Sequence, residues 1–265
     1  MRFRSASEPG TPGVPNEDFA AVASPAGGAG GVLVLLDGVT AGEIDGGCRH
    51  GVAWFTARLG GALLELAGAR PELTLPACLA AAITRTADAH RGTCDLSHPR
   101  TPQATVVCAR WDAAELEYLV LCDSVLLVEE PEGAVRPVLD ARLDALRPAA
   151  RRLPAGERVA FVEGLRNAEG GFFTAAADPG VAGRAVTGSL PRGRVRALAA
   201  LSDGVGRWVE TFRFGDWSAL FRALTKEGPE AVIERVRAAE AADPRGETHP
   251  RGKAHDDATA IVAEP

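Results

Sequence analysis

The sequence predicts a layered α+β sandwich in which helices pack against antiparallel strands. Three observations support this: apolar strand-like runs come in consecutive groups, helix-like segments come in two separate pairs, and the regular alternation of strand and helix that marks a parallel sheet is missing. The chain has 265 residues, which is enough for one large domain or two small ones. Its 46% hydrophobic and 24% charged residues are ordinary for a globular protein.

The first half of the chain predicts two strands followed by two helices. Residues 1–15 are rich in Gly, Pro and Ser and predict an extended N-terminal arm. Strands are predicted over 19–23 and 31–36, and the second is apolar throughout, as expected where both faces of a strand are covered. Helices are predicted over 51–66 and 73–90, where apolar residues recur at helical spacing.

The second half begins with a block of strands. Residues 104–111, 116–121 and 125–129 are apolar runs joined by short polar turns, which predicts a meander. Residues 131–191 hold many Arg, Pro and Gly residues with little apolar periodicity, and predict an insertion or flap. The last expected elements are a strand over 195–201, helices near 217–225 and 229–243, and a strand over 258–263. We expect one domain over residues 16–265.

Charge and cysteine content exclude several classes of protein. The net charge of −6 and the scattered arginines give no footprint for nucleic acid, and the apolar runs are too short or too polar to span a membrane. The start lacks the apolar run of a secretory signal. An odd number of cysteines, five, favours a reducing, cytoplasmic setting. His90 and His98 around Cys94 are too irregular to predict a zinc site, and His50 is expected to be a surface or capping residue.

Acidic residues recur in one local context, at the end of an apolar strand or in the turn beside it. Hard cations such as Mg²⁺ and Mn²⁺ prefer oxygen ligands, and carboxylates that converge at strand ends can hold two such ions. Taken singly, each residue is better explained as a turn or helix-cap residue. The joint pattern favours a metal site, and its members are Asp18, Asp37, Asp123, Asp203 and Asp256, the last followed by Asp257.

Six short motifs occur in order along the chain. They are Asn-Glu-Asp-Phe (16–19), Leu-Asp-Gly (36–38), Thr-Pro-Gln-Ala-Thr-Val (101–106), Leu-Cys-Asp-Ser (121–124), Leu-Ser-Asp-Gly-Val (201–205) and Asp-Asp-Ala-Thr-Ala-Ile-Val (256–262). In order and approximate spacing this series resembles the type 2C metal-dependent protein phosphatases (the PPM family), in a divergent, bacterial-type, single-domain form. The resemblance implies a four-layer αββα sandwich, with two central antiparallel sheets flanked by helix pairs and a flap that overlaps residues 131–191.

The resemblance also implies roles for the aspartates in binding two or three Mn²⁺ or Mg²⁺ ions. Asp37 would bridge two ions and the carbonyl of Gly38 would bind one of them. Asp203 would help to complete the coordination of the second ion, which makes Asp37 and Asp203 the residues expected to be essential for catalysis. The remaining ligands are implied to be Asp256 for the second ion, Asp18 for metal-bound waters and Asp123 for the looser third ion. The implied reaction is hydrolysis of phosphoserine or phosphothreonine in a phosphoprotein by a metal-activated water.

Three departures from the family pattern affect the substrate side of this site. Gly13 stands where the family usually has an arginine that grips the phosphate, and Val39 follows Gly38 where animal-type members soon have a histidine. The segment over residues 40–47 also differs in sequence from the glycine-rich segment that the family has at this place. We expect Arg4 or Arg2 on the N-terminal arm to replace the missing grip, unless both are solvated tail charges. Lower-ranked candidates for substrate contact are Arg49, Arg166 and His255.

The departures leave two other functions open. One is a pseudophosphatase, which keeps the fold and the metals but serves as a regulatory binding module. The other is a phosphatase of small phosphorylated molecules. The complete carboxylate set argues for an enzyme, whereas the missing arginine and histidine argue for the binding module. The oligomeric state is not predicted by the sequence.

Overall fold

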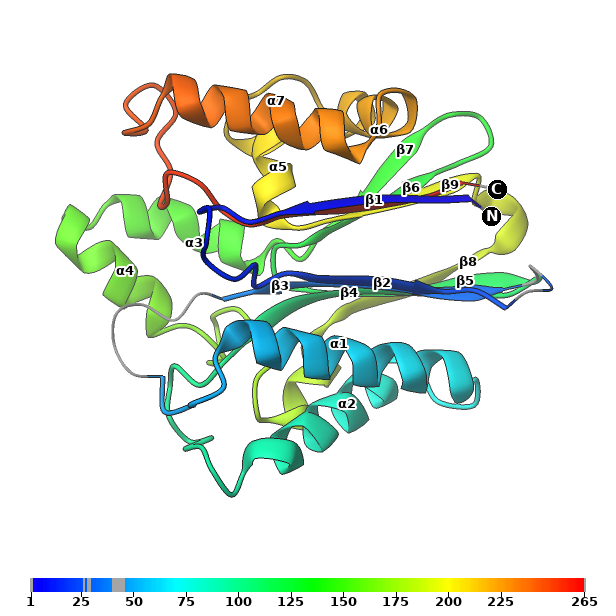
Figure 1. Ribbon diagram of the computed structural model, residues 1–265, viewed down its shortest axis with the longest axis horizontal. Coiled ribbons are helices and arrows are strands. Elements are labelled where there is room, and N and C mark those ends of the chain that lie inside the picture. The colour runs from blue at the N-terminus through cyan, green and yellow to red at the C-terminus, as the bar shows by residue number, and fades with distance from the viewer. Residues whose placement is uncertain (1, 26, 28–29, 40–45, 265) are drawn as a thin grey trace.

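Two five-stranded antiparallel sheets lie face to face in the computed structural model, which describes residues 2–25, 27, 30–39 and 46–264 (Figure 1). One sheet has the order β1-β10-β9-β6-β7 and the other β2-β3-β4-β5-β8. The strands of the first are β1 (Arg2–Glu8), β10 (Ala258–Glu264), β9 (Ala197–Leu201), β6 (Val125–Glu129) and β7 (Val135–Val138). Those of the second are β2 (Phe19–Ala23), β3 (Gly31–Gly38), β4 (Ala104–Trp111), β5 (Glu115–Leu121) and β8 (Val186–Pro191).

Helices cover the outer faces of both sheets, which confirms the αββα sandwich. Helices α1 (Val52–Ala69) and α2 (Leu75–His90) pack on the sheet that contains β3. The other sheet is covered by α5 (Asp203–Glu210), α6 (Trp217–Lys226) and α7 (Pro229–Ala242). Helices α3 (Arg142–Arg151) and α4 (Ala155–Glu163) lie beyond one end of the sheets (Figure 1). Among the described residues, no helix is both long and apolar enough to cross a membrane.

Strand β3 shows why an uninterrupted apolar run belongs in the middle of this sandwich. Val32, Val34 and Leu36 pack against α1 and α2, whereas Leu33 and Leu35 face the opposite sheet. Successive side chains of a strand point to opposite faces, so a strand buried on both faces has no position for a polar residue until it ends. The run ends at Asp37, and the expectation that both faces of this strand are covered is confirmed.

The first residues form an edge strand rather than the free arm that we expected. Strand β1 pairs with β10 along its whole length, from Arg2 opposite Glu264 to Glu8 opposite Ala258. The sequence did not reveal this strand because its side chains are partly polar. An edge strand with one solvent-exposed face carries the same charged residues as a solvated tail.

The predicted meander is wrong at its second turn. Strands β4 and β5 form a hairpin, but the chain then crosses to the other sheet, where β6 pairs with β9 and β7. Cys122 in this turn has a φ of 69°, and its amide donates to the buried carboxylate of Asp140 at 3.0 Å. Residues 131–191, expected to be an insertion or flap, include α3 and α4 but also contribute β7 and β8 to the sheets.

One glycine allows α5 to begin against β10. A Cβ atom at Gly204 would lie 2.0 Å from the carbonyl oxygen of Asp257, whereas one at Gly206 would meet no neighbour outside its helix closer than 3.9 Å. We therefore expect Gly204→Ala to lower the free energy of unfolding by about 1–3 kcal/mol through overpacking. Gly206→Ala should be neutral or stabilise by up to about 1 kcal/mol, because alanine favours a helix. Denaturant unfolding of both variants checks this, and equal stability would contradict the close approach.

Candidate active site

Four of the five predicted aspartates line one cavity at the edge where strands of both sheets end. Asp37 closes β3, and Asp203 opens α5 directly after β9. Asp123 lies in the turn between β5 and β6, and Asp256 precedes β10. The cavity has a volume of about 390 Å³, and its lining also includes Gly38. The structure thus brings together residues that are more than 200 positions apart in the sequence.

The carboxylates lie close enough to shift one another's protonation. The backbone amide of Asp203 donates to Oδ2 of Asp37 at 3.1 Å, which joins the end of β3 to the start of α5. Burial, and then the negative charges of Asp203 and Asp18, raise the pKa of Asp37 well above its usual value. Burial together with Asp256 and Asp123 raises the pKa of Asp203 to about 8. These carboxylates need a positive charge beside them to be ionised at neutral pH.

Asp18 lies close to this group, near enough for its charge to raise the pKa of Asp37. Both of its carboxylate oxygens are buried without a well-formed hydrogen bond to a described residue. Burial raises the pKa of Asp18 to about 7, although the nearby side chains of Thr259 and Ser202 lower it, and the charges of Asp257 and Asp256 add to the rise. A buried carboxylate that lacks a well-formed hydrogen bond is costly, so this is a position where a cation or an ordered water would be stabilising.

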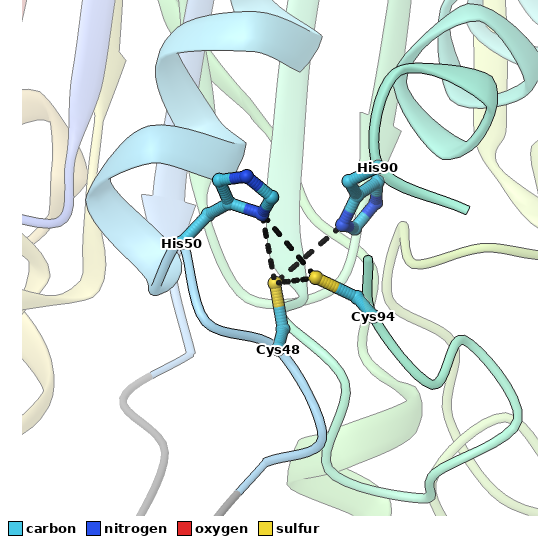
Figure 2. A group of neighbouring side chains, drawn as sticks. All are labelled: Cys48, His50, His90 and Cys94. Carbon is cyan, nitrogen blue, oxygen red and sulfur yellow. Dashed lines mark hydrogen bonds between the residues drawn. The ribbon is translucent and has the colours of Figure 1, made fainter. Parts of the chain in front are cut away.

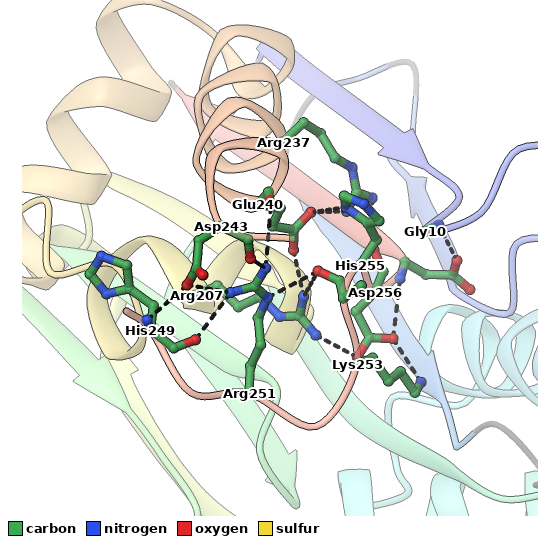
Figure 3. A network of polar contacts seen from close by, with 12 residues as sticks. Gly10, Arg207, Arg237, Glu240, Asp243, His249, Arg251, Lys253, His255 and Asp256 are labelled. Atoms are coloured by element: carbon green, nitrogen blue, oxygen red, sulfur yellow. Dashed lines mark hydrogen bonds and ion pairs between the residues drawn. The ribbon is translucent and has the colours of Figure 1, made fainter. Parts of the chain in front are cut away.

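Asp256 differs from the other members because two basic side chains already contact it. Lys253 Nζ lies 2.8 Å from Oδ1 and Arg207 Nη2 lies 3.0 Å from Oδ2 (Figure 3). Arg207 is buried and also contacts Glu240, which is fully buried and accepts from Arg237 and pairs with His255. The protein itself therefore supplies part of the positive charge that the carboxylate cluster needs.

Asp257, which follows Asp256 in the sequence, has a structural role. Asp257 accepts hydrogen bonds from the amides of Gly10 and Glu17, both at 2.7 Å. These contacts hold the segment between β1 and β2 against the start of β10, and thereby place Asp18 close to the cluster. Sequence reasoning gave this residue no separate role.

The structure places Arg2 and Arg4 away from the cavity, so the expectation that they grip the phosphate is wrong. Both side chains contact Glu264, and Arg4 also donates to the carbonyl of Thr225. Glu264 ends β10 whereas Asp256 precedes its start, and a strand of seven residues spans about 20 Å. The pairing of β1 with β10 fixes this separation.

Other basic residues do line the cavity. Arg166 is one of them, but it pairs with Glu163 at 2.6 Å, and Arg251 pairs with Asp243 at 3.2 Å. Lys253 differs because its side chain is 46% exposed while its ammonium group contacts a cluster member. Its position three residues before a predicted ligand was the signal that sequence reasoning missed. Arg49 is exposed and is not among the residues lining the cavity, and residues 40–45 of the segment that differs from the family lie outside the described part of the chain.

Comparison with known proteins identifies the fold. No family model and no curated protein sequence matches the chain. Among solved structures, a bacterial serine phosphatase matches with a TM-score of 0.61 at 18% identity, over 100% of this chain and 97% of the other. The serine/threonine phosphatase Stp1 from Staphylococcus aureus matches with a TM-score of 0.59 at 16% identity, over 100% and 95%. The catalytic domain of the serine/threonine phosphatase PstP, in complex with two manganese ions, matches with a TM-score of 0.58 at 18% identity, over 99% and 97%. The chain therefore has a divergent form of the type 2C (PPM) phosphatase fold.

The raised pKa values predict how stability depends on pH when no Mn²⁺ or Mg²⁺ is added. In the folded chain the pKa is about 7 for Asp18 and about 8 for Asp203, against about 3.9 for an unfolded aspartate. The folded state therefore binds more protons, so its stability falls as the pH rises from about 5 through 8. Thermal unfolding between pH 5 and 9 should show this decline, and added Mn²⁺ should reduce it.

Two variants distinguish the contribution of the aspartate cluster to this pH dependence from that of other carboxylates. Asp203→Asn should flatten the decline, because a neutral amide removes one titrating group from the cluster. Asp88→Asn, on the exposed face of α2, should leave it unchanged. An Asp203→Asn profile as steep as that of the wild type would show that this carboxyl group has an ordinary pKa.

Proposed function

We propose that the chain hydrolyses phosphate monoesters of serine or threonine in proteins, with Mn²⁺ or Mg²⁺ held by the aspartate cluster. The observation that carries the proposal is the convergence of Asp37, Asp203 and Asp123 on one cavity, close to the buried carboxylate of Asp18. Carboxylates collected in this way destabilise a fold unless cations neutralise them. The fold comparison adds support, because one matching structure holds two manganese ions.

The donor set suits hard cations, since it consists of carboxylates and the carbonyl of Gly38. Asp37, Asp203 and Asp256 would hold the ions directly, Asp18 would support them from beneath, and Asp123 would hold a further ion. Bound there, the ions would activate a water and neutralise the phosphate in an in-line displacement. The chain's own contribution is to hold these carboxylates at the ends of rigid strands, and the link from the Asp203 amide to Asp37 fixes two of them relative to one another.

Lys253 is the best candidate in this chain for holding the substrate phosphate. Its ammonium group reaches the cluster through Asp256, and half of its side chain faces solvent. Burial opposes its charge, but Asp256, Asp203 and Asp37 together raise the pKa of Lys253, so it stays protonated. An ammonium group here can bind a phosphate oxygen as a point charge, in the place of the arginine fork that Gly13 does not supply.

The first functional prediction concerns Asp37. Asp37→Asn should lower kcat on a phosphopeptide by about 100-fold or more, because a neutral amide neutralises no cation. It should also remove most of the rise in Tm that Mn²⁺ gives the wild type. Phosphate release and thermal unfolding measure the two effects, with Asp88→Asn as the control. Wild-type turnover in Asp37→Asn would refute the metal assignment at this position.

The second concerns Lys253 and uses the fact that the chain has two lysines. Lys253→Ala should lower kcat/KM by about 10- to 100-fold, the loss expected for one charged hydrogen bond, and Lys253→Arg should keep part of the activity. Lys226 lies beside Arg2 and Glu264, so Lys226→Ala serves as the control. Equal kinetics of the Lys253→Ala and Lys226→Ala variants would exclude Lys253 as a phosphate ligand.

A pseudophosphatase is the second candidate, and the contacts of Asp256 favour it. Arg207 and Lys253 already neutralise this carboxylate, which lowers the gain from binding a cation there. If the chain is a binding module, it should turn over neither phosphopeptides nor small phosphate esters with Mn²⁺ or Mg²⁺. It should still bind Mn²⁺ or a phosphopeptide. Turnover of small esters alone would instead indicate a phosphatase of small molecules. A cytoplasmic location also stays a prediction.

A further inference from the structure

A second cluster of metal-binding side chains lies outside the carboxylate cavity. Cys48 and His50 immediately precede α1, His90 is the last residue of α2, and Cys94 follows four residues later (Figure 2). One ligand atom from each of these four residues lies within 4.8 Å of all the others. Figure 2 shows both sulfur atoms and both imidazole rings directed toward a common centre. We propose that Cys48, His50, His90 and Cys94 bind a structural Zn²⁺ ion.

The distances between sulfur and nitrogen ligand atoms fit tetrahedral zinc, and the two sulfur atoms, 3.2 Å apart, would separate by about 0.5 Å to reach the tetrahedral spacing. Bonds of about 2.3 Å to sulfur and 2.0–2.1 Å to nitrogen imply ligand atoms about 3.3–3.8 Å apart. Sγ of Cys48 lies 3.7 Å from Nδ1 of His50 and 3.5 Å from Nδ1 of His90. Sγ of Cys94 lies 3.3 Å from Nδ1 of His50. A set of two thiols and two imidazoles is one of the common closed zinc sites, whereas Mg²⁺ and Mn²⁺ prefer oxygen.

The alternative explanations for the cluster are a disulfide and ordinary packing. The two sulfur atoms lie 3.2 Å apart, against about 2.05 Å in a disulfide, and both cysteines are free thiols. Weak thiol–imidazole hydrogen bonds would join the residues in pairs. They give no reason for two rings and two sulfur atoms from separate segments to converge on one point, whereas a tetrahedral ion does.

The surroundings hold the two histidines in place. Trp54 on the first turn of α1 stacks on His50 with ring centroids 4.3 Å apart, and its ring lies 5.1 Å from that of His90. His90 itself is buried. Rings fixed in this way lose little conformational freedom when they bind an ion, which favours a preformed site.

The ion would join the start of α1 to the end of α2. A backbone hydrogen bond from the amide of Asp95 to the carbonyl of Gly47, at 2.8 Å, already links the chain beside these two segments. Zinc would add a cross-link between residues 48–50 and 90–94. This role is structural and does not depend on the proposed phosphatase activity.

The proposal differs from two expectations of the sequence, namely that His90, His98 and Cys94 make a poor zinc site and that His50 is a surface or capping residue. Sequence reasoning considered His98, whose Nδ1 accepts from the amide of Arg100 and which is not in the cluster. It missed Cys48 and His50, because the two halves of the site are 40 residues apart and meet only when α1 and α2 pack side by side. Such spacing has no short motif to signal it.

Zinc analysis of the purified full-length chain tests the proposal. The chain, prepared under reducing conditions with zinc in the growth medium, should contain about one zinc per molecule after gel filtration. Cys48→Ser and Cys94→Ser should each lose most of it. Cys78→Ser, which alters a buried thiol outside the cluster, should keep it, and so should Asp37→Asn, which alters the carboxylate site. No zinc in the wild type, or zinc lost only with Asp37→Asn, would overturn the proposal.

Cobalt substitution covers the case in which a cysteine variant fails to fold. Co²⁺ added to the zinc-free wild type should give intense tetrahedral bands in the visible range and thiolate-to-cobalt charge transfer in the near ultraviolet, and one equivalent of Zn²⁺ should abolish both. Carboxylate ligands give no thiolate band, so a spectrum without that band contradicts the site. Mass spectrometry that finds Cys48 bonded to Cys94 in reduced, zinc-supplemented protein would also contradict it.

Discussion

The burial of several aspartates beside one another is the constraint on which the centre of this structure depends. Asp37, Asp123 and Asp203 share a cavity edge, and each has its pKa raised by burial, with neighbouring carboxylates adding to the shift for Asp37 and Asp203. The fold tolerates the cost of burying these carboxylates because they lie at the ends of strands. The core between the sheets and helices therefore stays apolar. Gly204 lets α5 start against β10, and the amide of Asp203 then holds Asp37. The ends of the strands therefore hold these half-buried carboxylates together at one cavity.

The basic residues around Asp256 show how the chain manages this charge. Arg207 is buried between Asp256 and Glu240. Its two terminal guanidinium nitrogens each contact one of these carboxylates, which holds the side chain in place. Lys253 contacts Asp256 from the cavity side with nearly half of its side chain exposed, so its position is easier to change than that of the buried arginine. This asymmetry assigns a fixed structural role to the arginine and an adjustable one to the lysine.

The sequence allowed the sandwich and the aspartates to be predicted, because both leave local patterns. Strand β3 is apolar until Asp37, and the other aspartates also stand at strand ends, so each local run points to the same edge. Arg2 and Arg4 were misplaced because an edge strand such as β1 carries the same polar residues as a tail. The crossing at Cys122 was missed because a two-sheet path and a meander share the same strand lengths. The Cys and His cluster depends on the packing of α1 against α2, which no short segment encodes.

Two clusters of opposite chemical preference thus lie in one chain. The carboxylates suit hard cations that exchange with water, and the thiols and imidazoles suit one firmly held zinc ion. The carboxylate cluster is the central claim, and anomalous diffraction from crystals soaked in Mn²⁺ tests it most directly. The account predicts manganese peaks between Asp37, Asp203 and Asp256, with the ammonium group of Lys253 moved off Asp256. Crystals without manganese in the cavity, with Lys253 and Arg207 still paired to Asp256, would contradict it.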